Sequence, residues 1–238
     1  MFVETDKSWE ELQETTSSEN STAKRGIGFE IMWKIFNTIN HCLIAIISVV
    51  TIWLACNSTM AYLEWHVLLT TVGYQLLMAE MIMSLSGDNS WSHMLQKSTK
   101  KTVHALLACC GSILAIAGIS LVIYNKSKHF TSNHGIIGLV ALVFLVITVL
   151  NGPMVYFATF LRLKKPIFIK IYHNLTSILA FTFGIVCLCL GYEKGWFLRK
   201  TSQEVVTTFI IFSSITACLT LRTPILNTIR LIISVFRR

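Results

Sequence analysis

Long apolar runs, broken by short polar segments, dominate this sequence. A helix needs about 20 mostly apolar residues to cross roughly 30 Å of hydrocarbon. Six stretches reach that length: 35–56, 66–86, 103–124, 135–157, 172–192 and 205–222. The runs lack the period of two that barrel strands show, and backbone polar groups cannot be left open in lipid. We therefore predict an all-α integral membrane protein with six transmembrane helices.

The two ends of the chain differ from these runs. Residues 1–34 are acidic and rich in Ser and Thr, which predicts a disordered cytoplasmic tail with no cleavable signal peptide. Residues 35–222 form the predicted six-helix domain. The run at 205–222 ends where Arg222-Thr223-Pro224 interrupts it, so residues 223–238 are predicted to be a basic cytoplasmic tail.

Composition supports the membrane assignment. Charged residues make up 13% of the chain, whereas a soluble domain carries about 25%. The net charge of +8 does not indicate nucleic-acid binding, because the basic residues lie between the apolar runs. All seven cysteines lie inside apolar runs and no CxxC pair is present. They are interpreted as packing residues and not as disulfides or a zinc site.

The distribution of basic residues predicts the orientation. Of the 20 lysines and arginines, fifteen fall in the N-terminal tail, the second and fourth loops and the C-terminal tail, which share one side. The positive-inside rule places that side, with both termini, in the cytoplasm. Two glycosylation-type triplets, Asn57-Ser58-Thr59 and Asn125-Lys126-Ser127, fall on the opposite side and add weak support.

Histidines recur at the starts of the predicted spans. Ionisable side chains in membrane helices are costly and often mark function. His66 and His134 begin the two spans that run inward, so both lie near the outer face. His104 and His173 begin two spans that run outward, so both lie near the inner face. This predicts a four-helix core, helices two to five, holding two stacked histidine pairs; His41 is interpreted as an ordinary hydrogen-bonded core residue.

The paired histidines favour haem over a bare metal ion. Imidazole is a good axial ligand of haem iron, and helix bundles commonly enclose haem. Zinc is the main alternative, but carboxylate or thiolate ligands at matching depth are missing from the outer pair. Small residues near the histidines offer a flat face for a macrocycle, although glycines also allow helices to pack closely. They are Gly73, Gly111, Gly118, Gly135, Gly138, Ala180 and Gly184. The alternative function is a histidine-lined metal or proton transporter without haem.

Four short segments carry a resemblance to a known family. They are Glu64-Trp65-His66, Lys101-Thr102-Val103-His104, His129 through Asn133-His134-Gly135, and Lys170-Ile171-Tyr172-His173. With these in order at the span starts, residues 35–222 resemble the cytochrome b561 family, in its short six-span form. Many members have proline after the first of these histidines, where this chain has Val67. Valine changes the local helix entry but leaves His66 free to bind iron.

The resemblance implies an ascorbate-dependent transmembrane oxidoreductase with two haem b groups. His66 and His134 would hold the non-cytoplasmic haem, and His104 and His173 the cytoplasmic one. Electrons would pass from cytosolic ascorbate to monodehydroascorbate or a ferric chelate across the lipid bilayer. The resemblance further suggests an endoplasmic reticulum, vesicle or plasma membrane location and a homodimer.

Charged residues near the spans are candidates for substrate contacts. Lys97 and Lys101 precede His104 by seven and three residues, so all three share a face if the helix extends back that far. Their charge would attract the ascorbate monoanion, as would Lys170 before His173. For Lys164 and Lys165, the general basicity of cytoplasmic loops is a sufficient explanation.

Two further residues have open interpretations. His129, in the loop before His134, is a candidate contact for the outer acceptor, although an exposed loop histidine is more often simply solvated. Glu80 is the only acidic residue well inside an apolar run. It is either a hydrogen-bond acceptor or proton carrier near the inner haem, or a side chain that reaches the interface.

Overall fold

The computed structural model describes the backbone of residues 4–157 and 166–237, and side chains from residue 28 onward within them. The regular structure in this part of the chain is all helical, with no strands. The elements are α1 (Glu4–Cys56), α2 (Tyr62–Thr70), the π-helix η1 (Thr71–Met78), α3 (Ala79–Met83), α4 (Lys97–Asn125), α5 (Asn133–Tyr156), α6 (Pro166–Tyr192), α7 (Gly195–Leu198) and α8 (Gln203–Phe236). Six stretches are long and apolar enough to cross a membrane, which confirms the predicted fold class.

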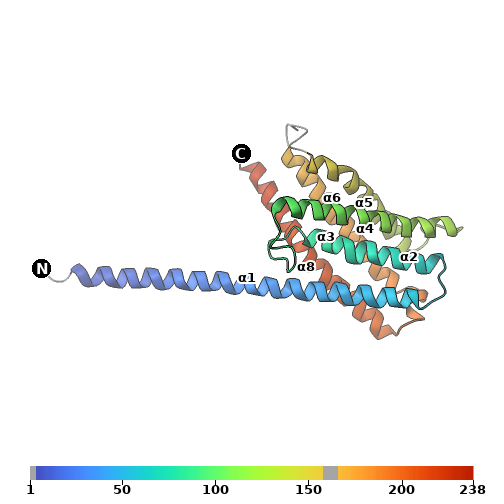
Figure 1. The fold of residues 1–238 in the computed structure, drawn as a ribbon, viewed down its shortest axis with the longest axis horizontal. Helices are drawn as coiled ribbons and strands as arrows, with labels where there is room; N and C mark the ends of the chain where they lie inside the picture. Colours follow the sequence, from blue (N-terminus) through green and yellow to red (C-terminus); the bar gives the residue numbers. More distant parts are fainter. Residues whose placement is uncertain (1–3, 158–165, 238) are drawn as a thin grey trace.

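The helices at both ends of the chain are longer than predicted. Helix α1 begins at Glu4, so the prediction of disorder over residues 1–34 is wrong for the described part of that segment. Figure 1 shows α1 extending well beyond the other helices. No proline lies between residues 4 and 56, so a helix nucleated in the span can continue toward the N-terminus.

Helix α8 also passes the predicted boundary. It continues through Pro224 to Phe236, so residues 223–236 are part of the last helix and not a separate tail. Membrane helices tolerate proline because neighbouring polar side chains satisfy the freed backbone groups. Pro224 lacks the N–H that would bond the Thr220 carbonyl, and on the following turn the Thr228 hydroxyl donates to the carbonyl of Pro224 itself at 2.7 Å.

The bundle has two ends that differ in their loops. The loops 57–61, 126–132 and 193–202 lie at one end, which we call the 57-loop end. Hydrogen bonds from Lys200 to Ser58 and from Trp196 to Glu64 join the 193–202 loop to the 57–61 loop and to the start of α2. The loop 84–96 lies at the opposite end, the 84-loop end, where Arg222 pairs with Asp88. Helices α2 to α6 form the core, and α1 and α8 pack along one side of it (Figure 1).

A buried apolar cluster fills the middle of the bundle between the two ends. It includes Tyr74, Ala115, Leu145, Phe181 and Ile185, which come from four different helices and are at most 5% exposed. The Tyr74 ring occupies the space beside Gly184, and its hydroxyl donates to the Ala141 carbonyl. This cluster separates the two ends with packed side chains.

The π-helix η1 changes the direction of side chains along the second span. An α-helix turns by 100° per residue, whereas a π-helix has more residues per turn. Residues before and after η1 therefore do not keep the phase that a 3.6-residue period predicts. Gly73, near the start of η1, still faces α4 as His66 does, whereas Glu80, beyond η1, contacts His41 of α1.

Candidate functional site

At the 57-loop end, His66 of α2 faces His134 of α5. Their ring centres are 6.2 Å apart and the rings are nearly perpendicular, at 89°. An imidazole nitrogen lies about 2 Å from a bound first-row metal ion, so two imidazoles on opposite sides of one ion have ring centres roughly 6 Å apart. The two rings therefore have the separation of axial ligands to a shared ion.

Backbone carbonyls orient both of these imidazoles. The Nδ1–H of His66 donates to the Gly118 carbonyl of α4 at 2.8 Å. The Nδ1–H of His134 donates to the Cys187 carbonyl of α6 at 2.9 Å. Because Nδ1 carries the proton, Nε2 is the atom with the free lone pair in each ring. Neither Nε2 atom has a hydrogen-bond partner among the described residues.

At the 84-loop end lie His104 of α4 and His173 of α6, the residues predicted to form the second pair. The Nδ1–H of His104 donates to the Met81 carbonyl at 3.1 Å. The Nδ1–H of His173 donates to Oδ1 of Asn151, a buried residue of α5, at 2.6 Å. Asn151 in turn donates to Thr176 at 3.1 Å, which fixes the orientation of its amide. Within the described residues, the second pair thus also leaves both Nε2 atoms free.

The four histidines fit haem better than a bare metal ion. Metal-binding histidines usually donate their other ring nitrogen to a carbonyl or carboxylate, as all four do here. In the part of the chain that the structure describes, no group of three or more His, Cys, Asp or Glu side chains gathers around an ion site. Structural zinc needs four protein ligands, whereas haem iron needs only the two axial ones. Two imidazoles per site match that requirement.

Helix α4 sets the separation of the two pairs. It carries His104 near one end, and fourteen residues later it carries Gly118, whose carbonyl holds His66. Fourteen residues of α-helix span about 21 Å. The apolar cluster around Tyr74 and Phe181 occupies the space between.

The glycines near the histidines pack helices together and do not form an open face. A Cβ on Gly73 would lie 2.8 Å from backbone atoms of α4, and a Cβ on Gly111 would lie 3.1 Å from the Gly73 carbonyl. The space beside Gly184 holds the Tyr74 ring. At Gly73, Gly111 and Gly184 this favours the alternative of close helix packing over a platform for a macrocycle, because protein atoms occupy the space. Two glycines that the sequence analysis did not select, Gly152 and Gly191, lie against the His173 and His134 rings.

The predicted substrate residues lie at the surface. Helix α4 begins at Lys97, so Lys97 and Lys101 do precede His104 on one helix, and both are exposed, as is Lys170 on α6. Lys164 and Lys165 lie outside the described residues. His129 is exposed at the 57-loop end, with its ring 6.0 Å from that of Phe130. No contact joins any of the described candidates to a histidine pair.

Several residues of the site were missed by the sequence analysis. Asn151 was visible in principle, because it is a lone amide inside an apolar run. The carbonyls of Met81, Gly118 and Cys187 were not, because a backbone acceptor has no residue-type signal.

Comparison with known proteins identifies the family. The sequence pattern of eukaryotic cytochrome b561 matches residues 65–198, which is more than half of the chain and includes all four histidines. The chain belongs to the eukaryotic cytochrome b561 family. The family resemblance predicted from the span starts is thereby confirmed, and membership in the cytochrome b561 family implies haem b as a cofactor.

Curated relatives in three mammals are named transmembrane reductase CYB561D2. The human protein is 24% identical over 143 residues, covering 58% of this chain and 64% of its own length. The mouse protein is 25% identical over 138 residues, covering 56% and 62%, and the bovine protein is 24% identical over 146 residues, covering 60% and 66%. The match thus spans less than two thirds of each relative.

Proposed function

We propose that this cytochrome b561 family protein is a transmembrane reductase with two haem b groups. His66 and His134 hold one haem at the 57-loop end, and His104 and His173 hold the other at the 84-loop end. The observation that carries the proposal is the common construction of the four imidazoles: each Nδ1–H is bonded to an oxygen, and each Nε2 is free of partners among the described residues. The name of the mammalian relatives agrees with a reductase.

We further propose that the electron donor is cytosolic ascorbate and that the acceptor, on the other side of the membrane, is monodehydroascorbate or a ferric chelate. The donor would approach the 84-loop end, which the positive-inside rule assigns to the cytoplasm. Lys97, Lys101 and Lys170 are exposed there and carry the charge that attracts an anion. His129, exposed at the opposite end, is the proposed contact for the acceptor.

Bound haem supplies the one-electron chemistry, in which iron alternates between the ferric and ferrous states. The protein contributes three things. The four imidazoles would hold the haem groups in orientations set by their Nδ1 bonds, the lysines would raise the local concentration of the donor, and the apolar cluster between the pairs would exclude water. Tyr74 completes this barrier because its ring fills the gap beside Gly184 and its hydroxyl is satisfied by the Ala141 carbonyl.

The first test is the haem content of the purified protein. We expect a b-type spectrum, two haems per chain, and reduction by ascorbate. His66→Ala and His104→Ala should each remove one haem. His93→Ala is the matched control, because His93 lies in the 84–96 loop with its Nδ1 bonded to backbone carbonyls and belongs to neither pair; it should retain both. Folded protein without haem, produced with adequate haem supply, would contradict the proposal.

A second test addresses the direction and the substrates. Protein reconstituted in vesicles should let ascorbate on the side of the 84-loop end reduce a ferric chelate or monodehydroascorbate on the opposite side. Lys97→Ala with Lys101→Ala should raise the ascorbate concentration needed for half-maximal reduction, with little change in the haem spectrum. Transport of metal ions by haem-free protein would instead support the transporter function.

A further inference from the structure

A hydrogen-bonded ring at the 84-loop end connects α1, α3 and the 84–96 loop. His41 Nδ1 lies 2.6 Å from Oε1 of Glu80, and the other carboxylate oxygen of Glu80 accepts from the Trp91 indole N–H at 2.9 Å. His41 Nε2 lies 3.0 Å from Oδ1 of Asn89. Asn89 is fully buried, and its amide N–H donates to the Met83 carbonyl at 2.8 Å, which closes the ring back onto α3.

The geometry of this ring places an oxygen against each ring nitrogen of His41. The Asn89 amide N–H donates to the Met83 carbonyl and the Asn89 amide oxygen accepts from the backbone N–H of Trp91, so this oxygen faces His41. Both ring nitrogens of His41 therefore face oxygens, one of an amide and one of a carboxylate, and an ionised carboxylate only accepts. His41 is accordingly held between an amide oxygen and a carboxylate oxygen, the arrangement that an imidazole with both nitrogens protonated would fill.

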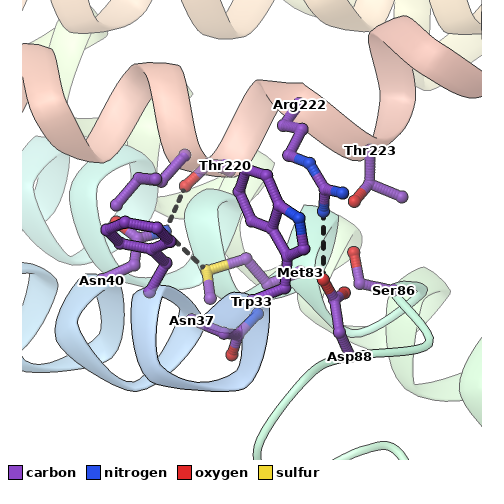
Figure 2. Close-up of a pocket in the computed structure, with 11 residues that line it drawn as sticks. Trp33, Asn37, Asn40, Met83, Ser86, Asp88, Thr220, Arg222 and Thr223 are labelled. Atoms are coloured by element: carbon purple, nitrogen blue, oxygen red, sulfur yellow. Dashed lines mark hydrogen bonds and ion pairs between the residues drawn. The ribbon is translucent and has the colours of Figure 1, made fainter. Parts of the chain in front are cut away.

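The hydrogen-bonded ring holds α3 in place, and α3 in turn orients the His104 imidazole of the 84-loop pair. Helix α3 has only five residues, Ala79–Met83. Glu80 and Met83 tie it to α1 and to the loop, and one of the two residues between these anchors, Met81, offers its carbonyl to His104. Figure 2 shows a second tie from Met83 to α1, in which the Asn40 amide donates to the Met83 sulfur at 3.2 Å and to Thr220 at 3.0 Å.

We propose that His41 and Glu80 are positioning residues for the haem ligand His104, acting through the Met81 carbonyl. This inference rests on the proposed function, because it takes His104 as a haem ligand. A firm Nδ1–H bond makes an imidazole a more basic ligand and tunes the metal that it binds. A more basic ligand favours the ferric state. Loosening α3 weakens the bond to Met81 and raises the midpoint potential of the haem at the 84-loop end.

The experiment is a redox titration of both haems in the purified, haem-loaded protein, with each low-spin ferric haem followed by its own electron paramagnetic resonance signal. Glu80→Ala and His41→Ala should each raise the midpoint potential of the haem at the 84-loop end. The expected rise corresponds to an equilibrium constant for reduction that is roughly threefold to tenfold larger. Tenfold is about 59 mV for a one-electron couple. The haem at the 57-loop end should keep its potential, and its signal reports in the same sample that the protein is folded.

Glu80→Gln separates positioning from a direct effect of charge. In this variant the introduced amide oxygen can accept from Trp91 while the amide N–H donates to a neutral His41, so the ring stays closed without the ion pair. Positioning predicts a potential within about twofold of the wild type for this variant. A shift as large as that of Glu80→Ala would overturn the proposal in favour of a charge effect.

The matched control removes the other ion pair at the same end. Arg222 pairs with Asp88 at 3.1 Å and stacks on Trp33, and neither contact involves α3 (Figure 2). Arg222→Ala should leave both potentials unchanged. An unchanged potential in both Glu80→Ala and His41→Ala would overturn the inference, and if one of them fails to fold the other decides. Absence of haem from the wild-type protein would instead contradict the proposed function.

Discussion

The two histidine pairs are built alike but are held by different kinds of groups. At the 57-loop end both acceptors are backbone carbonyls, of Gly118 and Cys187. At the 84-loop end one acceptor is the side chain of Asn151, and the other, the Met81 carbonyl, lies on a short helix that side chains hold in place. A backbone acceptor moves only with its helix, whereas a side-chain acceptor is lost by a single substitution. We therefore expect the 84-loop pair to be the more sensitive to mutation.

Asn151→Leu should have the largest effect. Leucine removes the acceptor of the His173 Nδ1–H and leaves that group unpaired in an apolar surrounding. Loss of such an outer partner typically costs about 10- to 100-fold in metal affinity. The measurement is the rate of haem transfer to excess apomyoglobin. We expect faster loss of one haem of the two, at the 84-loop end; equal loss from both ends would show that the pairs are not independent.

Thr176→Val should have an intermediate effect at the same pair. The Thr176 hydroxyl accepts from the Asn151 amide and so fixes which atom of that amide faces His173. Removing one such hydrogen bond costs about 1 kcal/mol, or roughly fivefold. The same haem-transfer assay measures it. An effect larger than that of Asn151→Leu would mean that Thr176 contributes more than the orientation of the amide.

Gly191→Ala should have a small effect at the 57-loop pair. A Cβ at residue 191 would lie 3.3 Å from Cε1 of His134, so the ring must shift slightly. We expect a cost of about 0.5 kcal/mol, roughly twofold in haem retention. Gly152→Ala is the matched control at the other pair, because its Cβ would lie 3.6 Å from the His173 ring, an ordinary contact. A larger effect at residue 152 than at 191 would reverse this ranking.

Cys187→Ala should have the smallest effect. The thiol lies 3.4 Å from Nδ1 of His134, but the strong acceptor at 2.9 Å is the backbone carbonyl, which alanine retains. We expect haem retention and the electron paramagnetic resonance signal of the 57-loop haem to change by less than about twofold. A change comparable to that of Asn151→Leu would show that this pair, too, depends on a side chain.

The sequence predicted the spans because these follow from local patterns, and it located the four candidate histidines at the starts of the core spans. Twenty apolar residues define a span wherever it packs, and a histidine at the start of each core span lies at a defined depth. The acceptors of Met81, Gly118 and Cys187 were not predictable, since any residue has a carbonyl. The His41–Glu80 pair was missed for another reason: it depends on the fold of the 84–96 loop and on the phase of the second span.

Residues 4–34 and 223–236 show that composition and local breaks do not reliably predict where a helix ends. The polar composition of the first and the Arg222-Thr223-Pro224 interruption before the second indicated tails, yet both continue the adjacent membrane helix. Composition reports whether a segment can bury apolar surface, but it does not report helix propagation from a stable neighbour. Asn151 is the opposite case, a residue whose importance was visible in the sequence because an amide inside an apolar helix needs a partner.

The π-helix η1 determines how side chains at the two ends of the second span are directed relative to each other. His66 precedes η1 and Glu80 follows it, so one segment sets the relative direction of the two. Seven residues of α-helix turn through nearly the same angle as the eight residues of η1, so deleting one residue from 71–78 should leave Glu80 directed toward His41. An α-helical path through all eight residues would instead turn Glu80 away from His41 by roughly 100°, although every side chain of both sites was still present. A one-residue deletion should accordingly be tolerated better within 71–78 than elsewhere in this span.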